Sequence, residues 1–233
     1  FGTAGLRGEI AAGPNRMNRS VVIRAAAGLS AFLAETVGPG FRVVIGCDAR
    51  HGSAQFQRDA AQVISAAGGK ALVLPAQNPT PLTAFTVRSL KADAGIMVTA
   101  SHNPPADNGY KVYLGGRCVE PTARGCQIVP PHDAQIAERI EAVGDLRELE
   151  LAESGWQILS EDIDRQYLEA VADPEAERSA SPRIVLTAMH GVGGPTALAA
   201  LERAGFDDVH PVAEQFEPDP EFPTAPFPNP EEP

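Results

Sequence analysis

The residues best suited to chemistry are Ser101 and His102, which stand side by side in the segment Thr99–Pro104. A serine hydroxyl becomes a nucleophile when a neighbouring group activates it. The apolar run Ala94–Val98 predicts a buried strand, so the pair should lie at the carboxyl end of that strand. Ligands bind at this edge in open α/β sheets. A lone Ser-His pair also fits a polar turn with a capping serine, so the choice depends on other motifs.

Two cationic side chains stand in patterns that suit phosphate binding. Arg7 lies in the glycine-rich segment Phe1–Gly8, and its guanidinium is a permanently charged fork for phosphate oxygens. Lys111 follows Asp107–Gly109, a sequence that predicts a turn after the serine segment. Taken singly, each side chain also fits an ordinary surface position.

Together these motifs resemble the α-D-phosphohexomutases, the family that includes phosphoglucomutases and phosphomannomutases. Thr-Ala-Ser-His-Asn-Pro at 99–104 is similar to the family's phosphoserine loop, Phe1–Gly8 to its arginine loop, and Asp107–Lys111 to its lysine segment. Their order and spacing fit as well. The segments Pro218–Pro223 and Pro228–Glu232 resemble most the branch with phosphopentomutase-like eukaryotic enzymes and their bacterial relatives.

The resemblance implies an isomerase that acts as an intramolecular phosphotransferase. Such an enzyme interconverts the 1-phosphate and 6-phosphate of glucose, mannose or both through a phosphoserine and a bisphosphorylated sugar. Its implied cofactors are Mg²⁺ and a hexose 1,6-bisphosphate, and its implied partner is a sugar phosphate. By match to the motifs, Ser101 is the phosphorylated catalytic residue and a contact of Mg²⁺. Arg7 and Lys111 hold phosphoryl oxygens, His102 contacts phosphate or assists proton transfer, and Lys111 also exchanges a proton.

The chain departs from the family pattern in its metal loop. The family holds Mg²⁺ with a second-domain loop of the type Asp-x-Asp-x-Asp-Arg, and this sequence contains no such loop. The sugar-discriminating loop of domain three and the phosphate loop of domain four are missing too. We therefore expect residues 1–233 to represent about the first half of an enzyme and to be inactive alone. Phe1, which falls inside a motif, and the helix-start pattern of Asn229–Glu232 support this expectation.

Three alternative functions stay open. The first is a phosphopentomutase, and the second is a non-catalytic paralogue that senses sugar phosphates. The third is a serine hydrolase, with His102 or His190 as the base for Ser101. A hydrolase is disfavoured because the chain has no Gly-x-Ser-x-Gly elbow and because adjacent residues rarely form a nucleophile–base pair.

Composition restricts the partners and the compartment. The net charge is −11, which argues against nucleic acid, since phosphate backbones require clustered Lys and Arg. The three cysteines (Cys47, Cys118 and Cys126) lack C-x-x-C spacing, which favours a reduced, cytoplasmic protein. No apolar run approaches the ~18 residues of a membrane span, and no signal peptide is recognisable. We therefore expect no membrane partner.

Alternating strands and helices must position the site. We expect a three-layer α/β/α domain over residues 1–150, because strands and helices alternate with short connections and so favour a mostly parallel sheet. Asp48 and Arg50 follow the first strand of this pattern, where they also fit a solvated loop with an ion pair; the family has a similar Asp-x-Arg at this place, and the resemblance implies that they support the site from behind. The expected strands are 41–46, 71–74, 94–98 and 109–114, and the expected helices start near residues 17, 53, 78 and 131.

A second, similar α/β domain should begin after residue 150 and stay incomplete within 151–233. A helix from about Ser160, a strand over Arg183–Ala188 and a helix ending at Gly205 indicate its start. His190 precedes a glycine-rich turn and is expected to be structural. Eight prolines from Pro211 onward predict an extended, semi-rigid segment, whose carboxylates the prolines hold too far apart to bind a metal.

Overall fold

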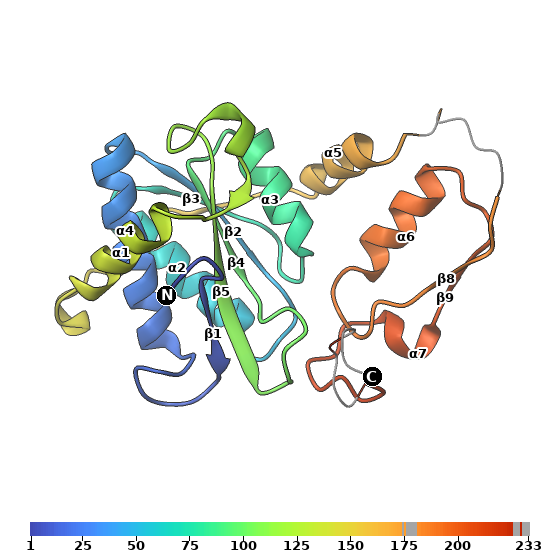
Figure 1. The fold of residues 1–233 in the computed structure, drawn as a ribbon, viewed down its shortest axis with the longest axis horizontal. Helices are drawn as coiled ribbons and strands as arrows, with labels where there is room; N and C mark the ends of the chain where they lie inside the picture. Colours follow the sequence, from blue (N-terminus) through green and yellow to red (C-terminus); the bar gives the residue numbers. More distant parts are fainter. Residues whose placement is uncertain (174, 176–180, 226–228, 230–233) are drawn as a thin grey trace.

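The first domain is built on a mixed sheet of seven strands (Figure 1). The computed structural model describes residues 1–173, 175, 181–225 and 229. The strand order is β1-β5-β4-β2-β3-β7, with β6 paired to β5. Strands β2, β3, β4 and β7 run parallel, whereas β5 is antiparallel to β4, β6 and β1. The strands are β1 (Leu6–Glu9), β2 (Arg42–Cys47), β3 (Lys70–Val73), β4 (Ala94–Val98), β5 (Asp107–Leu114), β6 (Cys126–Gln127) and β7 (Gln157–Ile158).

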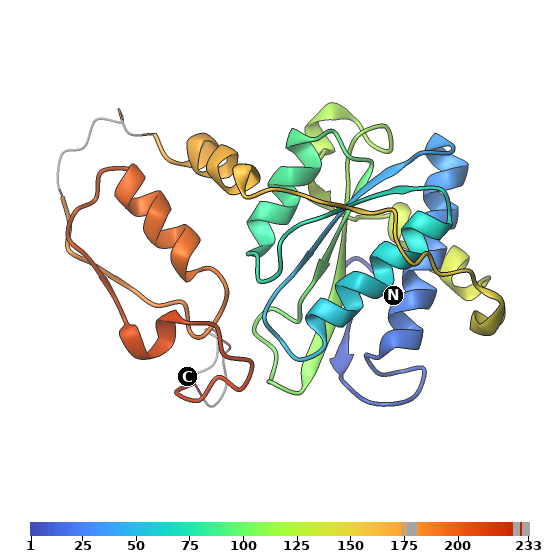
Figure 2. The same ribbon diagram turned by 180° about the vertical axis from the view of Figure 1, so that it is seen from behind.

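Helices cover both faces of this sheet, as Figures 1 and 2 show from opposite sides. The alternating side chains of β2 separate the two cores: Val43 and Ile45 pack with α1, α2 and α4, whereas Val44 packs on the side of α3. Because both faces are covered, β4 is buried along its whole length. The helices are α1 (Arg19–Val37), α2 (Ser53–Ala66), α3 (Thr80–Ser89) and α4 (His132–Glu141), with short 3-10 turns η1 (Pro121–Ala123) and η2 (Leu146–Glu148).

Helix α1 illustrates how sequence signals define an element. The Asn18 side chain caps its start by accepting a hydrogen bond from the Val21 amide, and Gly38, at φ 87°, ends it. By length and composition alone α1 could span a membrane, which differs from the expectation drawn from the sequence. In this fold, however, Leu29 and Leu33 are completely buried and α1 packs against α2 and α4, as a core helix does.

The second domain begins with a β-α-β unit. Strands β8 and β9 pair in parallel, and α6 connects them, as predicted. The bounds are α5 (Asp162–Val171), β8 (Ile184–Leu186), α6 (Gly194–Arg203), β9 (Val209–Pro211) and α7 (Ala213–Phe216). The boundary at residue 150 stays a prediction, although β7 still joins the first sheet through Ile158.

The proline-rich segment is folded in its described part. It forms α7 and then tight turns in which Phe222 donates to Asp219 and Ala225 donates to Phe222. Phe222 and Ala225 are buried, so this part is not an extended linker. Apart from Asn229, the second motif noted in the sequence, Pro228–Glu232, lies outside the described residues.

Two local expectations near the serine segment were wrong. Asp107–Gly109 do not form a turn but open β5, where they pair with Glu9, Gly8 and Arg7 of β1. The turn lies earlier, where the Asp107 amide donates to the Pro104 carbonyl. Pairing between strands distant in sequence therefore overrides the local turn preference. For the same reason Arg7 stands on a strand and not within a loop.

Candidate active site

Ser101 is presented on a strained loop between β4 and β5. Its φ is 58°, in the left-handed region that non-glycine residues rarely adopt. Two hydrogen bonds hold this geometry: the Ser101 amide donates to the Thr99 hydroxyl at 2.9 Å, and the Asn103 amide donates to the Ala100 carbonyl at 3.1 Å. Because Ser101 is exposed, its hydroxyl is open to a ligand. Strain of this kind at an exposed nucleophile is typical of functional sites.

The β1–β5 pairing brings Arg7 to the serine loop. Arg7 lies opposite Gly109, and its guanidinium Nη1 donates to the Asn103 side chain at 3.0 Å. The amide group of Asn103 in turn donates to the Asp107 carboxylate at 2.8 Å. Asn103 thus orients the arginine, a role that we did not identify from the sequence. The sequence feature that could have pointed to this role is the position of Asn103, two residues after Ser101.

Lys111 lies on β5 opposite Met97 of β4. Burial lowers the pKa of the half-buried Lys111 ammonium, and the positive charge of Arg7 lowers it further, while Asp48 raises it. Arg7 and Lys111 therefore share one electrostatic neighbourhood beside the serine loop. Two cations that repel each other gain from an anion placed between them, and a phosphoryl group is such an anion.

Arg50 holds the serine loop from behind. Its side chain is 2% exposed, and it donates to four loop carbonyls: Ser101 at 2.9 Å, Asn103 at 2.6 Å, Pro104 at 2.8 Å and Asp107 at 3.1 Å. Burial lowers the pKa of the guanidinium, against the opposing effect of Asp48, whose carboxylate lies 3.6 Å away. The expected supporting role of Asp48 and Arg50 agrees with this geometry, but the four carbonyl contacts were not predicted.

Asn108 fixes the base of the loop. It is completely buried on β5, and its amide donates to the His51 carbonyl and the Ser53 hydroxyl, both at 2.9 Å. The Ser53 hydroxyl donates to Asp48 at 2.6 Å. The start of α2 is thereby linked to the strand that carries Lys111.

Neither histidine considered as a base is bonded to Ser101. The ring of His102 makes no hydrogen bond within the part of the chain that the structure describes, so it is available to a ligand. His190 is buried in the second domain, where its Nε2 lies 2.8 Å from the Thr224 hydroxyl. This structural contact fits the role expected for His190.

The residues around Ser101 do not by themselves fit a Mg²⁺ ion. Among the described residues, no group of three or more His, Cys, Asp or Glu side chains is placed to hold a metal. Asp48 and Asp107 are already bonded to Ser53 and Asn103. Arg7, Arg50 and Lys111 make the surroundings cationic. The metal contact expected at Ser101 therefore stays a prediction.

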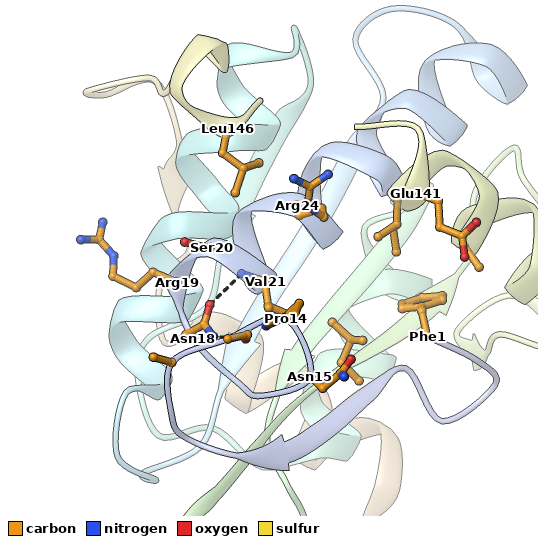
Figure 3. A pocket seen from close by; sticks show the side chains of 15 residues that line it. Phe1, Pro14, Asn15, Asn18, Arg19, Ser20, Val21, Arg24, Glu141 and Leu146 are labelled. Atoms are coloured by element: carbon orange, nitrogen blue, oxygen red, sulfur yellow. Dashed lines mark hydrogen bonds between the residues drawn. The ribbon is translucent and has the colours of Figure 1, made fainter. Parts of the chain in front are cut away.

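A cavity of about 870 Å³ lies away from this site (Figure 3). It is enclosed by the β1–α1 connection, the start of α1 and the end of α4, and Phe1, Val21 and Leu146 are among its lining residues. Ser101, Arg7 and Lys111 do not line it. The candidate site around Ser101 is therefore separate from this cavity.

Comparison with known proteins agrees with this arrangement. The family model described as phosphoglucomutase/phosphomannomutase, alpha/beta/alpha domain I matches residues 1–147, and the corresponding domain II model matches 165–233. A probable phosphomannomutase of Haemophilus influenzae is 42% identical over 93% of this chain and 44% of its own length. A phosphoribomutase of Saccharomyces cerevisiae is 38% identical over the whole chain and 40% of its own length.

A solved structure shows the same fold. The crystal structure of a putative phosphomannomutase from Thermus thermophilus matches with a TM-score of 0.75 and 31% identity, over 96% of this chain and 47% of that one. The chain thus spans less than half the length of these relatives. With both family models matched in order along its sequence, the chain belongs to the phosphoglucomutase/phosphomannomutase family.

Proposed function

We propose that the protein carrying this chain is a sugar-phosphate mutase that transfers a phosphoryl group through Ser101. The observation that carries the proposal is the exposed, left-handed Ser101 beside two cations, Arg7 and Lys111. The relatives are mutases, which supports the reaction class. We propose glucose or mannose phosphates as substrates, with interconversion of the 1- and 6-phosphates.

The side chains present can perform the transfer in simple steps. In the phosphorylated enzyme, a sugar hydroxyl attacks phosphorus while the bond from phosphorus to the Ser101 oxygen breaks. Charge develops on the phosphoryl oxygens, and preorganised cations are the main source of catalysis in such reactions. Arg7 supplies a planar fork and Lys111 a compact charge. The hydroxyl proton needs an acceptor, which the unbonded ring of His102 can provide, while Lys111 stays protonated.

The type of sugar is the least constrained part of the proposal. One relative is named for mannose phosphates and another for ribose phosphates. A phosphopentomutase is therefore the second candidate, since the proline-rich segment also resembles that branch. Both candidates use the same phosphoserine, so they differ only in the ranking of substrates.

Two cofactors belong to the proposal. Membership of the family implies the usual dependence on Mg²⁺. When bound, the metal would withdraw charge from a phosphoserine oxygen. A hexose 1,6-bisphosphate would load the serine, because one of its phosphates passes to Ser101 and leaves a sugar monophosphate.

Mass spectrometry of the peptide that spans residues 94–111 tests the proposal. The intact polypeptide is incubated with glucose 1,6-bisphosphate and Mg²⁺, and we expect one phosphoryl group on Ser101. A parallel sample with a chelator should acquire much less. A serine that stays unmodified, in a protein that still binds the bisphosphate, would favour the non-catalytic sensor.

The charge of Arg7 should be visible in the pH dependence of turnover. We take the protonated Lys111 to be the form that holds the phosphoryl oxygens, so activity falls as pH rises through its pKa. Burial and Arg7 lower that pKa, so the fall begins below the pH typical of lysine. In Arg7→Gln the positive charge that lowers the Lys111 pKa is lost, so this pKa rises. The decline of activity at alkaline pH should therefore move to higher pH.

Arg16→Gln is the matched control for this shift. Arg16 pairs with Glu9 of the same strand at 3.5 Å and does not perturb Lys111. Its profile should match that of the unaltered enzyme. If the decline of activity at alkaline pH stays at the same pH in Arg7→Gln, a group other than Lys111 controls it.

A further inference from the structure

A segment of the second domain packs directly on the arginine behind the serine loop. The guanidinium carbon of Arg50 lies 5.0 Å from the centre of the Phe222 ring, a distance within the range of cation–π contacts. Phe222 is 8% exposed and has a φ of 50°, which is unusual for an aromatic residue. A strained backbone that buries its side chain against a charge indicates a specific contact.

A second contact lies beside the first. Glu221 pairs with His51, the residue after Arg50, and its own amide is fixed by the Asp219 carboxylate at 2.9 Å. Both side chains of this pair are more than half exposed, so it contributes little energy on its own. The pair does, however, set the register of the contact: the adjacent residues Glu221 and Phe222 lie against the adjacent residues His51 and Arg50.

The segment is firmly held within the second domain. The carbonyl of His190 accepts from the Asp219 amide at 3.0 Å, and its ring bonds the Thr224 hydroxyl at 2.8 Å. The Gln215 side chain donates to the same hydroxyl at 2.9 Å. Phe222 stands between these two attachment points, so its position is set by the second domain.

We propose that Phe222 is a positioning residue for Ser101, acting from the second domain through Arg50. The proposal rests on the proposed function, because it concerns the same phosphoserine. Phe222 excludes water from the guanidinium. The guanidinium is then left with the Asp48 carboxylate and the four carbonyls that hold the loop. Docking of the second domain thus stabilises the left-handed conformation that exposes the Ser101 hydroxyl.

The variant Phe222→Leu separates this contact from simple burial. Leucine retains an apolar side chain but lacks the aromatic face that attracts a cation. Amide hydrogen exchange of Ser101, Asn103 and Asp107 reports the loop, because each amide is hydrogen-bonded within it. We expect exchange there to quicken, and phosphorylation of Ser101 by glucose 1,6-bisphosphate to slow, by roughly 2- to 30-fold.

Three further variants of the intact polypeptide complete the test. Phe222→Tyr, which restores the aromatic face, should recover most of both effects. Phe216→Leu alters an aromatic residue that packs on Gly194 inside the second domain, and should leave the loop amides unchanged. Phe222→Leu should add little in an Arg50→Gln background, which has no cation for the ring, because contacting residues couple in double-mutant cycles.

The results distinguish this proposal from the function on which it rests. Unchanged loop exchange in Phe222→Leu, in an enzyme whose Ser101 is phosphorylated, overturns the positioning role alone. Equal effects of Phe216→Leu and Phe222→Leu also overturn it, since general loosening of the domain would then explain both. If Ser101 is never phosphorylated but loop exchange still depends on Phe222, the mutase proposal fails and the structural coupling stands.

Discussion

Replacement of Ser101 by alanine should lower sugar-phosphate turnover by at least about 10³-fold, because it removes the atom that carries the phosphoryl group. Loss of a catalytic nucleophile has effects of this order or larger, since the remaining cations cannot substitute for a covalent intermediate. Ser101 is exposed, so Ser101→Ala should fold normally. Turnover is measured on the intact polypeptide, with urea unfolding as the measure of stability.

Ser89→Ala serves as the matched control. Ser89 is an exposed serine at the end of α3, and its hydroxyl makes one long hydrogen bond, 3.4 Å, to Gln166. Its loss should leave turnover and stability unchanged. Near-normal turnover in Ser101→Ala would show that the phosphoserine mechanism is wrong, whatever the substrate.

Gly109→Ala should damage both stability and activity. A methyl group at this position would lie 2.5 Å from the Thr99 carbonyl oxygen and 2.8 Å from that of Leu6. Both are backbone atoms, so relief requires β1 or the serine loop to move. We expect a loss of about 3 kcal/mol in the free energy of unfolding, at the upper end for overpacked sites. Arg7 pairs with Gly109, and the Thr99 amide donates to the Gly109 carbonyl. A shift at Gly109 would therefore displace both Arg7 and the serine loop, so turnover should fall as well.

Gly8→Ala is the control on the neighbouring strand. Nothing lies within 4 Å of a methyl group added there, and Gly8 has no left-handed φ. Its unfolding midpoint in urea should stay close to that of the unaltered protein. Equal, small effects of the two substitutions would contradict the tight three-way contact of β1, β5 and the serine loop.

The sequence predicted the parallel part of the first domain well. Strands such as Ala94–Val98 are short apolar runs bounded by polar turns, and their burial on both faces leaves few alternative structures. The end of α1 was equally clear, because Gly38 follows a long run of helical periodicity. Local signals and the final fold agree at these positions.

Expectations failed where distant strands decide the structure. Asp107–Gly109 favour a turn locally, but pairing with β1 draws them into a strand. β7 is only two residues long and exposed, so no pattern marks it. The contacts of Arg50 with four carbonyls have no sequence signature, since backbone acceptors are the same for every residue.

The residues of the candidate site also fall into two groups, those that sequence motifs identify and those that only the fold brings together. Its four members, Arg7, Ser101, His102 and Lys111, came from motifs, and their roles stay predictions. The structure places Arg7 beside the serine loop and in the electrostatic neighbourhood of Lys111. Asn103, which links Arg7 to the loop, and Asn108, which links the loop base to α2, were missed because amides bind through geometry that only the fold defines.

The edge position of β1 has a consequence for biosynthesis. Among the residues that the structure describes, strand β1 pairs only with β5 in the main sheet, and the bonded residues Arg7 and Asn103 are 96 positions apart. A ribosome that adds about 5 to 20 residues per second makes Asn103 roughly 5 to 20 s after Arg7. During that interval the nascent arginine has no strand to join. The edge that carries Arg7 and the serine loop thus forms only after β5 has emerged, so a chain terminated before β5 cannot display it.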